Sequence, residues 1–246
     1  MPVEFRNFSY SYLRKGKRVF APSEIGRAIG NELKERIAGA VIFDDFYFHL
    51  KSGGHVSALH AHRPNEFFIR LDIKNFFYCI GRNRIARALK SCGIDRHSHY
   101  AKWSTVKNPF NDPSYALPYG FVQSPIVASL VLQNSALGAL LKSLSERFVV
   151  SVYVDDISVS GNDRDELAEV YENLRLAFLD SEFISNDEKA RSPTSEIEIF
   201  NCNLRRGFAS VTGERIGKFN SVERSPESKT GFETYCEFVL EGNTPE

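Results

Sequence analysis

The chain has 246 residues, of which 42% are hydrophobic and 25% charged, and its 31 basic and 31 acidic residues cancel to a net charge of zero. This composition is typical of a globular protein with one large domain or two small ones. It contains no apolar run long enough to span a membrane and no apolar signal region at its N-terminus. We therefore expect a cytoplasmic protein without membrane contact.

The first third of the chain predicts a mixture of strands and helices. Residues 8–20 are typical of a hairpin, and Ser23 is a suitable N-cap for a helix with apolar residues at helical spacing. The β-rich run 66–71 predicts a strand that ends at Asp72. A short helix is expected over 83–92, stopped by a glycine.

The middle of the chain predicts a loop, a long helix and a second hairpin. Residues 101–123 are rich in proline and read as loop, and Ser124 followed by proline predicts the N-cap of one helix over 124–147. Residues 148–153 and 157–160 predict the two strands of a hairpin. An Asp-led capping box at 163–166 predicts another helix.

A further strand is expected at 196–203. The resulting order of strand, interrupted helix, strand, strand, helix and strand suits a ferredoxin-like α+β fold, an antiparallel sheet with helices on one face. Four widely spaced cysteines without a CxxC pair predict reduced thiols rather than disulfides or zinc.

The charges are unevenly distributed along the chain. Residues 14–18 read RKGKR, and residues 82–107 hold seven Lys or Arg against one acid, whereas residues 155–188 hold eleven acids and two arginines. A chain of zero net charge can therefore present a basic groove to nucleic acid. A pair of solvated basic faces is the alternative that charge alone leaves open.

Three aspartates form the main candidate for a chemical site. Asp72 follows the first strand of the expected sheet, and Asp155 and Asp156 occupy the tip of the hairpin. If those elements are neighbours, three carboxylates converge and need cations to offset their repulsion. Two Mg²⁺ ions about 4 Å apart, for which Mn²⁺ can substitute, would neutralise them and support phosphoryl transfer. The alternative for the aspartate pair alone is a solvated turn.

Segments spread over most of the chain resemble, in the expected order, the motifs of reverse transcriptases, and in particular the bacterial retron-like and abortive-infection enzymes. The matching segments are LRKGKRVFAPS at 13–23, LKSGGHVSALHAH at 50–62, LDIKNFF at 71–77, LPYGFVQSP at 117–125, YVDD at 153–156, ISNDEKA at 184–190 and EIFNCNLRRG at 198–207.

The resemblance implies a right-hand polymerase fold with fingers and a ferredoxin-like palm. The implied domains are fingers at 1–66, palm at 67–82, a basic insertion at 83–116, palm at 117–196, a primer-grip hairpin at 197–212 and a C-terminal extension at 213–246. About 39 residues follow Gly207, so we expect a short or absent thumb. A vestigial thumb, a partner protein or oligomer that supplies its function, and a truncated chain all remain open.

The resemblance also implies roles for individual residues around the aspartates. Asp72, Asp155 and Asp156 would be the catalytic carboxylates and metal ligands, with Asp156 the weaker one, and the carbonyl of Ile73 would be a further ligand. Lys189 would protonate or neutralise the departing pyrophosphate.

Other implied roles concern the incoming nucleotide and the primer. Phe77 would exclude a ribose 2′-OH and so favour dNTPs. The remaining nucleotide-binding residues would be Arg14, Lys15, Arg18, Tyr119 and Gly120, and the primer grip would include Asn203 and Leu204. Tyr119 departs from the family pattern, which often has glutamine there, so its usual hydrogen bond is in doubt.

The implied activity is RNA-directed DNA synthesis, with an RNA template, dNTPs and a DNA product. We expect the template to be a structured noncoding RNA and the biology to be antiphage defence. The alternatives are template-independent DNA synthesis, an RNA-dependent RNA polymerase, a non-catalytic RNA-binding scaffold that retains the palm, and a ferredoxin-like RNA-binding module. Phe77 and YVDD disfavour the RNA polymerase, and the intact aspartates disfavour the scaffold.

Overall fold

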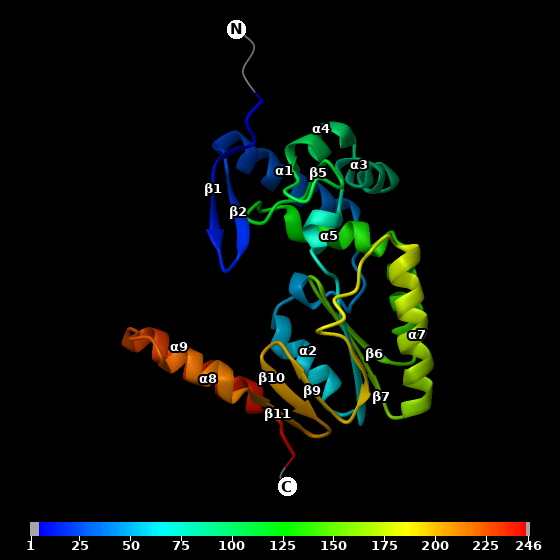
Figure 1. Ribbon diagram of the computed structural model, residues 1–246, viewed down its shortest axis with the longest axis vertical. Coiled ribbons are helices and arrows are strands. Elements are labelled where there is room, and N and C mark those ends of the chain that lie inside the picture. The colour runs from blue at the N-terminus through cyan, green and yellow to red at the C-terminus, as the bar shows by residue number, and fades with distance from the viewer. Residues whose placement is uncertain (1–4, 245–246) are drawn as a thin grey trace. The chain divides into compact units, whose positions relative to one another are not determined.

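The structure is a computed structural model that describes residues 5–244 (Figure 1). These residues form two compact units. Unit 1 comprises 5–44, 73–139 and 178–184, and unit 2 comprises 45–72, 140–177 and 185–244. Each unit is built from separate stretches of the chain, so residues distant in sequence become neighbours within one unit.

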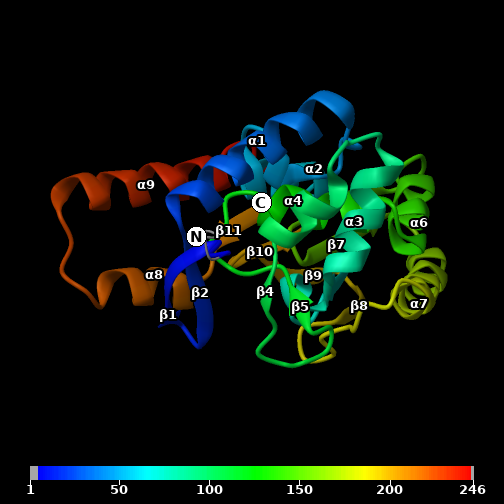
Figure 2. The same ribbon diagram turned by 90° about the horizontal axis from the view of Figure 1, so that it is seen from above.

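The N-terminal part of unit 1 confirms the predicted hairpin and helix. Strands β1 (Phe8–Arg14) and β2 (Lys17–Pro22) pair antiparallel, and α1 (Glu24–Ala40) follows. The Ser23 hydroxyl accepts a hydrogen bond from the Gly26 N–H at 3.0 Å, as an N-cap does. The rest of unit 1 contains η2 (Phe76–Cys79) and α5 (Ser124–Gln133). It also contains α3 (Arg82–Ser91), α4 (His97–Trp103), β4 (Val106–Lys107) and β5 (Tyr115–Ala116) (Figure 2).

Two expectations for this part of the chain were wrong. The stretch 101–123 is not all loop, because it contains the end of α4 and the paired strands β4 and β5. The N-cap of α5 is Gln123, one residue before the expected Ser124. The Ser124 hydroxyl instead donates to the Pro118 carbonyl at 2.7 Å, which fixes the preceding loop.

The single helix expected over 124–147 was also wrong. It is broken into α5 and α6 (Ala136–Leu144), which are bent by 78°. At the break the Leu137 N–H donates to the Ser181 hydroxyl at 2.8 Å, and the Gly138 N–H donates to the Ser135 hydroxyl. Both N–H groups are therefore satisfied without a continuous helix. Within residues 5–244 no single helix is long and apolar enough to cross a membrane, although this bent pair passes that test jointly.

Unit 2 is organised around a four-stranded antiparallel sheet in the order β6-β7-β3-β8. Its strands are β3 (Phe67–Asp72), β6 (Val149–Tyr153), β7 (Asp156–Gly161) and β8 (Arg191–Thr194). The predicted hairpin is confirmed, as is the predicted cap of α7 (Arg164–Asp180), since Asp163 accepts from the N–H groups of Asp165 and Glu166. The other helical segments near this sheet are η1 (Phe48–Leu50) and α2 (Gly54–His62).

A second sheet in unit 2 has the order β11-β10-β9. The strand expected at 196–203 was wrong, because it is two strands, β9 (Glu196–Ile199) and β10 (Cys202–Arg205). Phe200 and Asn201 form the turn between them, both with positive φ, as a tight two-residue hairpin requires. The remaining elements are β11 (Phe208–Val211), α8 (Gly213–Asn220) and α9 (Pro226–Leu240).

The second sheet packs into one apolar core with α2, β3 and α9. The core is formed by Leu59 of α2, Phe68 of β3, Leu204 of β10 and Val239 of α9, all at most 2% exposed, with further residues of the second sheet. This core fixes the second sheet against the strand that ends at Asp72.

Candidate active site

The three aspartates meet at one end of the four-stranded sheet. Asp72, the last residue of β3, is the cross-strand partner of Asp156, the first residue of β7, and Asp155 lies in the adjoining turn. One carboxylate oxygen from each of the three lies within 4.8 Å of the other two. Asp72 is buried and the other two are half-buried. The predicted convergence is therefore confirmed.

The turn that carries Asp155 is conformationally strained. Tyr153 pairs with Asp156, which leaves Val154 and Asp155 as a two-residue turn. Val154 has φ of 60°, a region that β-branched residues rarely occupy. Its N–H donates to Nδ1 of His49 at 3.1 Å. Burial lowers the pKa of His49, which favours the neutral ring that can accept this bond.

Asp72 is held by two side chains from the segment that follows α7. Asn186 Nδ2 donates to Asp72 Oδ1 at 3.0 Å, and Lys189 Nζ donates to Asp72 Oδ2 at 2.7 Å. The Asn186 N–H also donates to the Asp72 carbonyl at 2.9 Å. The resemblance had implied a role for Lys189, and the structure places its ammonium on the Asp72 carboxylate.

Asp156 is held by a different cation. Arg70 donates to Asp156 Oδ1 from Nε at 2.9 Å and from Nη2 at 2.5 Å. Its third donor, Nη1, reaches the carbonyl of Glu198 on β9 at 2.9 Å. Arg70 therefore connects the hairpin carboxylate to the second sheet.

A hollow of about 630 Å³ in unit 2 opens beside Asp155 and Asp156. Its walls include the turn residues Phe200 and Asn201 and, from the C-terminal helices, Arg215. The other lining residues are His55, Tyr153, Val154, Phe219, Ser228, Gly231, Phe232 and Tyr235. The hollow thus combines aromatic rings and a cation with two of the carboxylates.

The wall of this hollow is tied together by Tyr235 of α9. Its hydroxyl lies 3.3 Å from His55 Nε2 and 3.4 Å from Cys202 Sγ. Burial, reinforced by the Cys202 contact, raises the pKa of Tyr235, and burial lowers the pKa of His55. Both groups are therefore neutral near pH 7. Cys202 and the other cysteines are free thiols, as predicted.

Below the hairpin tip, a buried histidine joins its two strands. His62 of α2 is 1% exposed and makes 2.7 Å hydrogen bonds to the hydroxyls of Ser151 on β6 and Ser160 on β7. Burial lowers the pKa of His62 to about 3, so the ring is neutral at physiological pH. A neutral imidazole donates through one nitrogen and accepts through the other, which matches two hydroxyl partners.

Unit 1 brings together the residues implied in nucleotide selection. The rings of Phe77 and Tyr119 have centroids 4.9 Å apart, and Phe77 is only 7% exposed. The Tyr119 carbonyl accepts from the Phe20 N–H at 2.8 Å, which joins this loop to β2. A Cβ on Gly120 would lie 2.3 Å from the Phe20 carbonyl oxygen, so the close approach requires glycine.

The three basic residues implied in triphosphate binding lie on the β1–β2 hairpin of the same unit. Lys15 is in its turn, with φ of 49°, Arg14 directly precedes that turn, and Arg18 is the second residue of β2. All three side chains are exposed. Arg18 Nη1 donates to the Ser11 hydroxyl at 3.2 Å.

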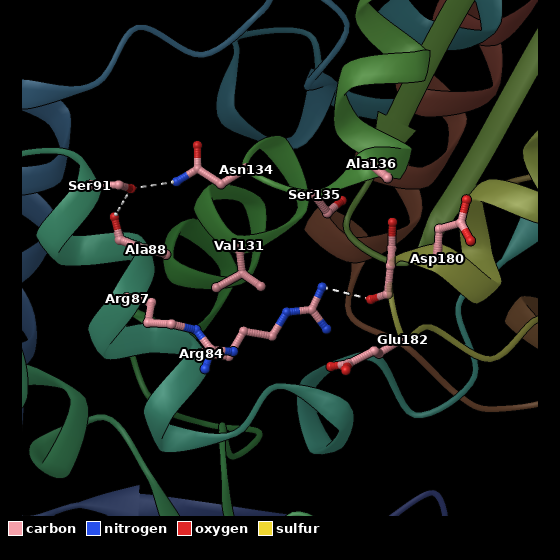
Figure 3. A pocket seen from close by; sticks show the side chains of 11 residues that line it. Arg84, Arg87, Ala88, Ser91, Val131, Asn134, Ser135, Ala136, Asp180 and Glu182 are labelled. Carbon is pink, nitrogen blue, oxygen red and sulfur yellow. Dashed lines mark hydrogen bonds between the residues drawn. The ribbon is translucent and has the colours of Figure 1, made fainter.

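Another hollow in unit 1, of about 660 Å³, is shown in Figure 3. Arg84 and Arg87 line it, together with Asp180 and Glu182. Arg84 Nη2 donates to the Ser181 carbonyl at 2.8 Å. Its two cations are balanced by two carboxylates, so its charge favours neither an anion nor a cation, and none of the three aspartates belongs to it.

The donor set at the aspartates fits a hard divalent cation. Three carboxylates offer the oxygen ligands that Mg²⁺ and Mn²⁺ prefer, within a span that such ions can bridge. Among the described residues this is the group that could hold a metal ion.

Three other residues to which the resemblance assigned roles are Asn203, Leu204 and Ile73. Asn203 and Leu204 lie along β10, where Asn203 is exposed and Leu204 is in the core, whereas the hairpin turn is Phe200 and Asn201. The side chain of Ile73 is buried. The roles assigned to these three residues stay predictions.

Sequence reasoning missed His49, Arg70 and the Phe200–Asn201 turn. Arg70 precedes Asp72 by two residues on a strand, so both point to one face, and that spacing could have revealed it. No sequence signal connects His49 with Val154, which is 105 residues away.

A family model described as reverse transcriptase (RNA-dependent DNA polymerase) matches residues 11–204. The chain belongs to the reverse transcriptase family. The match covers the aspartates and their partners Arg70, Asn186 and Lys189, but ends before α8 and α9. A search of curated proteins gave no match.

Solved structures of the foamy viral protease-reverse transcriptase share the fold. The complex with dsDNA is 17% identical, with a TM-score of 0.54, over 92% of this chain and 41% of that one. A second complex with ds DNA is 16% identical, with a TM-score of 0.55, over 90% and 34%. The complex with an RNA/DNA hybrid is 17% identical, with a TM-score of 0.50, over 80% and 23%. The chain thus spans less than half the length of these proteins.

Proposed function

We propose that the protein is an RNA-directed DNA polymerase that adds dNTPs to a primer by metal-assisted phosphoryl transfer. The observation that carries the proposal is the meeting of Asp72, Asp155 and Asp156 within 4.8 Å in a chain of the reverse transcriptase family. Divalent cations, with Mg²⁺ the expected ion, would activate the primer hydroxyl and stabilise the leaving pyrophosphate.

The chain's own residues have separate tasks in this proposal. Asp72 and Asp155 bind the cations, and the strained Val154 turn, held by His49, fixes the position of Asp155. Lys189, whose ammonium contacts Asp72, would donate a proton to an oxygen of the departing pyrophosphate. Phe77 and Tyr119 select deoxyribose by occupying the space that a 2′-OH needs.

We further propose a structured noncoding RNA as template and antiphage defence as the biological role. The basic stretch 82–107 supports an RNA partner, because within residues 5–244 none of its seven Lys and Arg side chains forms a salt bridge. The exposed ones outside the charge-balanced hollow, Lys90, Arg96, Lys102 and Lys107, remain available for phosphates. The resemblance to retron-like and abortive-infection enzymes supports the biological role.

Primer extension by the purified protein tests the chemistry. The protein, with an RNA template, a DNA primer, dNTPs and Mg²⁺, is expected to extend the primer, and Asp155→Asn is expected to abolish extension. Asp187→Asn is the matched control, because Asp187 is an exposed aspartate paired with Arg175. Equal extension by wild type and Asp155→Asn would refute the proposal. Sequencing of copurifying nucleic acid then identifies the template and tests the RNA assignment.

A further inference from the structure

The sheet places a cation diagonally across from the carboxylate that begins β7. Arg70 and Asp72 are two residues apart on β3 and so share one face, and Asp156 is directly opposite Asp72. Diagonal neighbours on one face are within reach of a long side chain. The contact between Arg70 and Asp156 is therefore a direct consequence of the strand register.

The Arg70 contact leaves Asp156 with its charge already offset. Two guanidinium N–H groups converge on Asp156 Oδ1, and the two side chains are only 16% and 20% exposed. A partly buried, charge-assisted pair with two donors is geometrically fixed. Asp156 thus has less uncompensated charge to offer a metal ion.

Asp72 differs because its cation is loosely held. The Lys189 side chain is 47% exposed and reaches Asp72 Oδ2 with one ammonium group on a flexible stem. Its other partner, Asn186, is neutral. A divalent cation can displace Lys189 into solvent at small cost, whereas displacing Arg70 would break three hydrogen bonds.

The third hydrogen bond of Arg70 connects its side chain to the second sheet. Glu198, whose carbonyl accepts it, lies on β9 two residues before the Phe200–Asn201 turn. That turn and Asp156 both line the 630 Å³ hollow. Arg70 consequently fixes two walls of the hollow relative to each other.

From these contacts we propose that Arg70 is a positioning residue that keeps Asp156 neutralised and attached to β9, so that metal binding falls on Asp72 and Asp155. This rests on the proposed function, since it concerns the same metal centre. On this proposal, Arg70 is the reason why Asp156 contributes less to metal binding than Asp155 does.

Mn²⁺ binding to the full chain, measured by titration without nucleic acid, tests the electrostatic part. Removal of the Arg70 charge restores a free carboxylate, so Arg70→Gln is expected to bind Mn²⁺ about tenfold more tightly than wild type. In the wild-type background, Asp156→Asn is expected to change the Mn²⁺ affinity by less than about twofold. In the Arg70→Gln background, the same substitution is expected to reverse the gain in Mn²⁺ affinity. Arg147→Gln, which removes an exposed arginine paired with Glu166, is the matched control.

Arg70→Lys separates charge from geometry. It keeps the charge, so Mn²⁺ affinity is expected within about twofold of wild type. It loses the fork and the Glu198 bond, so primer extension is expected to fall about tenfold. An Arg70→Gln affinity equal to or weaker than that of wild type, or an equal gain in Arg70→Lys, overturns the proposal.

Thermal unfolding of the single and double variants provides a readout that does not need metal. If Arg70 and Asp156 are coupled, the Tm changes of Arg70→Gln and Asp156→Asn are non-additive, and additive changes overturn the pair. If Arg70→Gln does not fold, Arg70→Met with Asp156→Asn gives the same cycle, because methionine also removes the charge. Failure of wild type to bind Mn²⁺ would refute the proposed function, whereas binding that is insensitive to Arg70 would refute this inference alone.

Discussion

Asp72 and Asp156 face each other across the β3–β7 ladder, although they are like charges at directly opposed positions. Such a pair destabilises a sheet unless cations offset it. The protein supplies Lys189 on one side and Arg70 on the other. The sheet can therefore fold before metal binds, because Lys189 and Arg70 offset the repulsion between the two carboxylates. The two cations differ in how easily a metal ion can displace them.

The steric gate can be tested at Phe77. Phe77→Ala is expected to lower the preference for dNTPs over rNTPs by about tenfold or more, because it opens space for a 2′-OH. The measurement is single-nucleotide incorporation with each substrate. Phe76→Ala is the matched control, since Phe76 is the neighbouring phenylalanine and is also buried. A wild type that already uses rNTPs as well as dNTPs would show the assignment to be wrong.

The role of Lys189 can be separated from binding by a side chain of similar length. Lys189→Met is expected to reduce kcat about a hundredfold with little change in KM, because it removes a proton donor but little binding surface. Lys218→Met, which removes an exposed lysine paired with Glu214, serves as control. An unchanged kcat would contradict the role.

A substitution at Gly120 tests how closely its loop packs against β2. Gly120→Ala is expected to destabilise unit 1 by about 2 kcal/mol, because its φ of 100° is unfavourable for alanine and the new Cβ would meet the Phe20 carbonyl. Chemical denaturation measures the change. Gly39→Ala is the control, since a Cβ there meets nothing within 4 Å. Equal effects of the two substitutions would contradict the close approach.

Because His62 is buried with a lowered pKa, we expect the free energy of unfolding to decrease in acid. Its pKa is about 3 in the folded protein against 6.5 for the free side chain, so between these values the unfolded state binds the extra proton. The free energy of unfolding should therefore fall by roughly 1.4 kcal/mol per pH unit as pH drops from 6.5 toward 3. In His62→Gln, this contribution to the pH dependence of the free energy of unfolding should be absent. The pKa values of the half-buried His49, His55 and His99 are lowered too, so the comparison of the variant with wild type isolates His62.

Denaturation at a series of pH values provides the measurement for His62. His97→Gln, at a half-buried histidine in α4, should keep the wild-type slope. An identical pH dependence in wild type and His62→Gln would show that His62 is not buried as a neutral group.

Local patterns predicted the elements that local forces determine. Ser23 predicted the start of α1 and Asp163 that of α7, because an N-cap needs only a side-chain oxygen and the next few N–H groups. The break between α5 and α6 could not be predicted this way. It depends on Ser181, which lies 44 residues from its partner Leu137.

By itself, the sequence determined the chemical identity of the site. It specified the YVDD hairpin, the aspartate after β3 and the family motifs, because strand periodicity, turn residues and motif order are properties of contiguous residues. Tertiary structure alone decided which cation holds which carboxylate, what supports the Val154 turn, and that Phe200 and Asn201 line the same hollow as Asp155 and Asp156. These contacts join residues tens to more than a hundred positions apart, and only the folded register of the sheets brings them together.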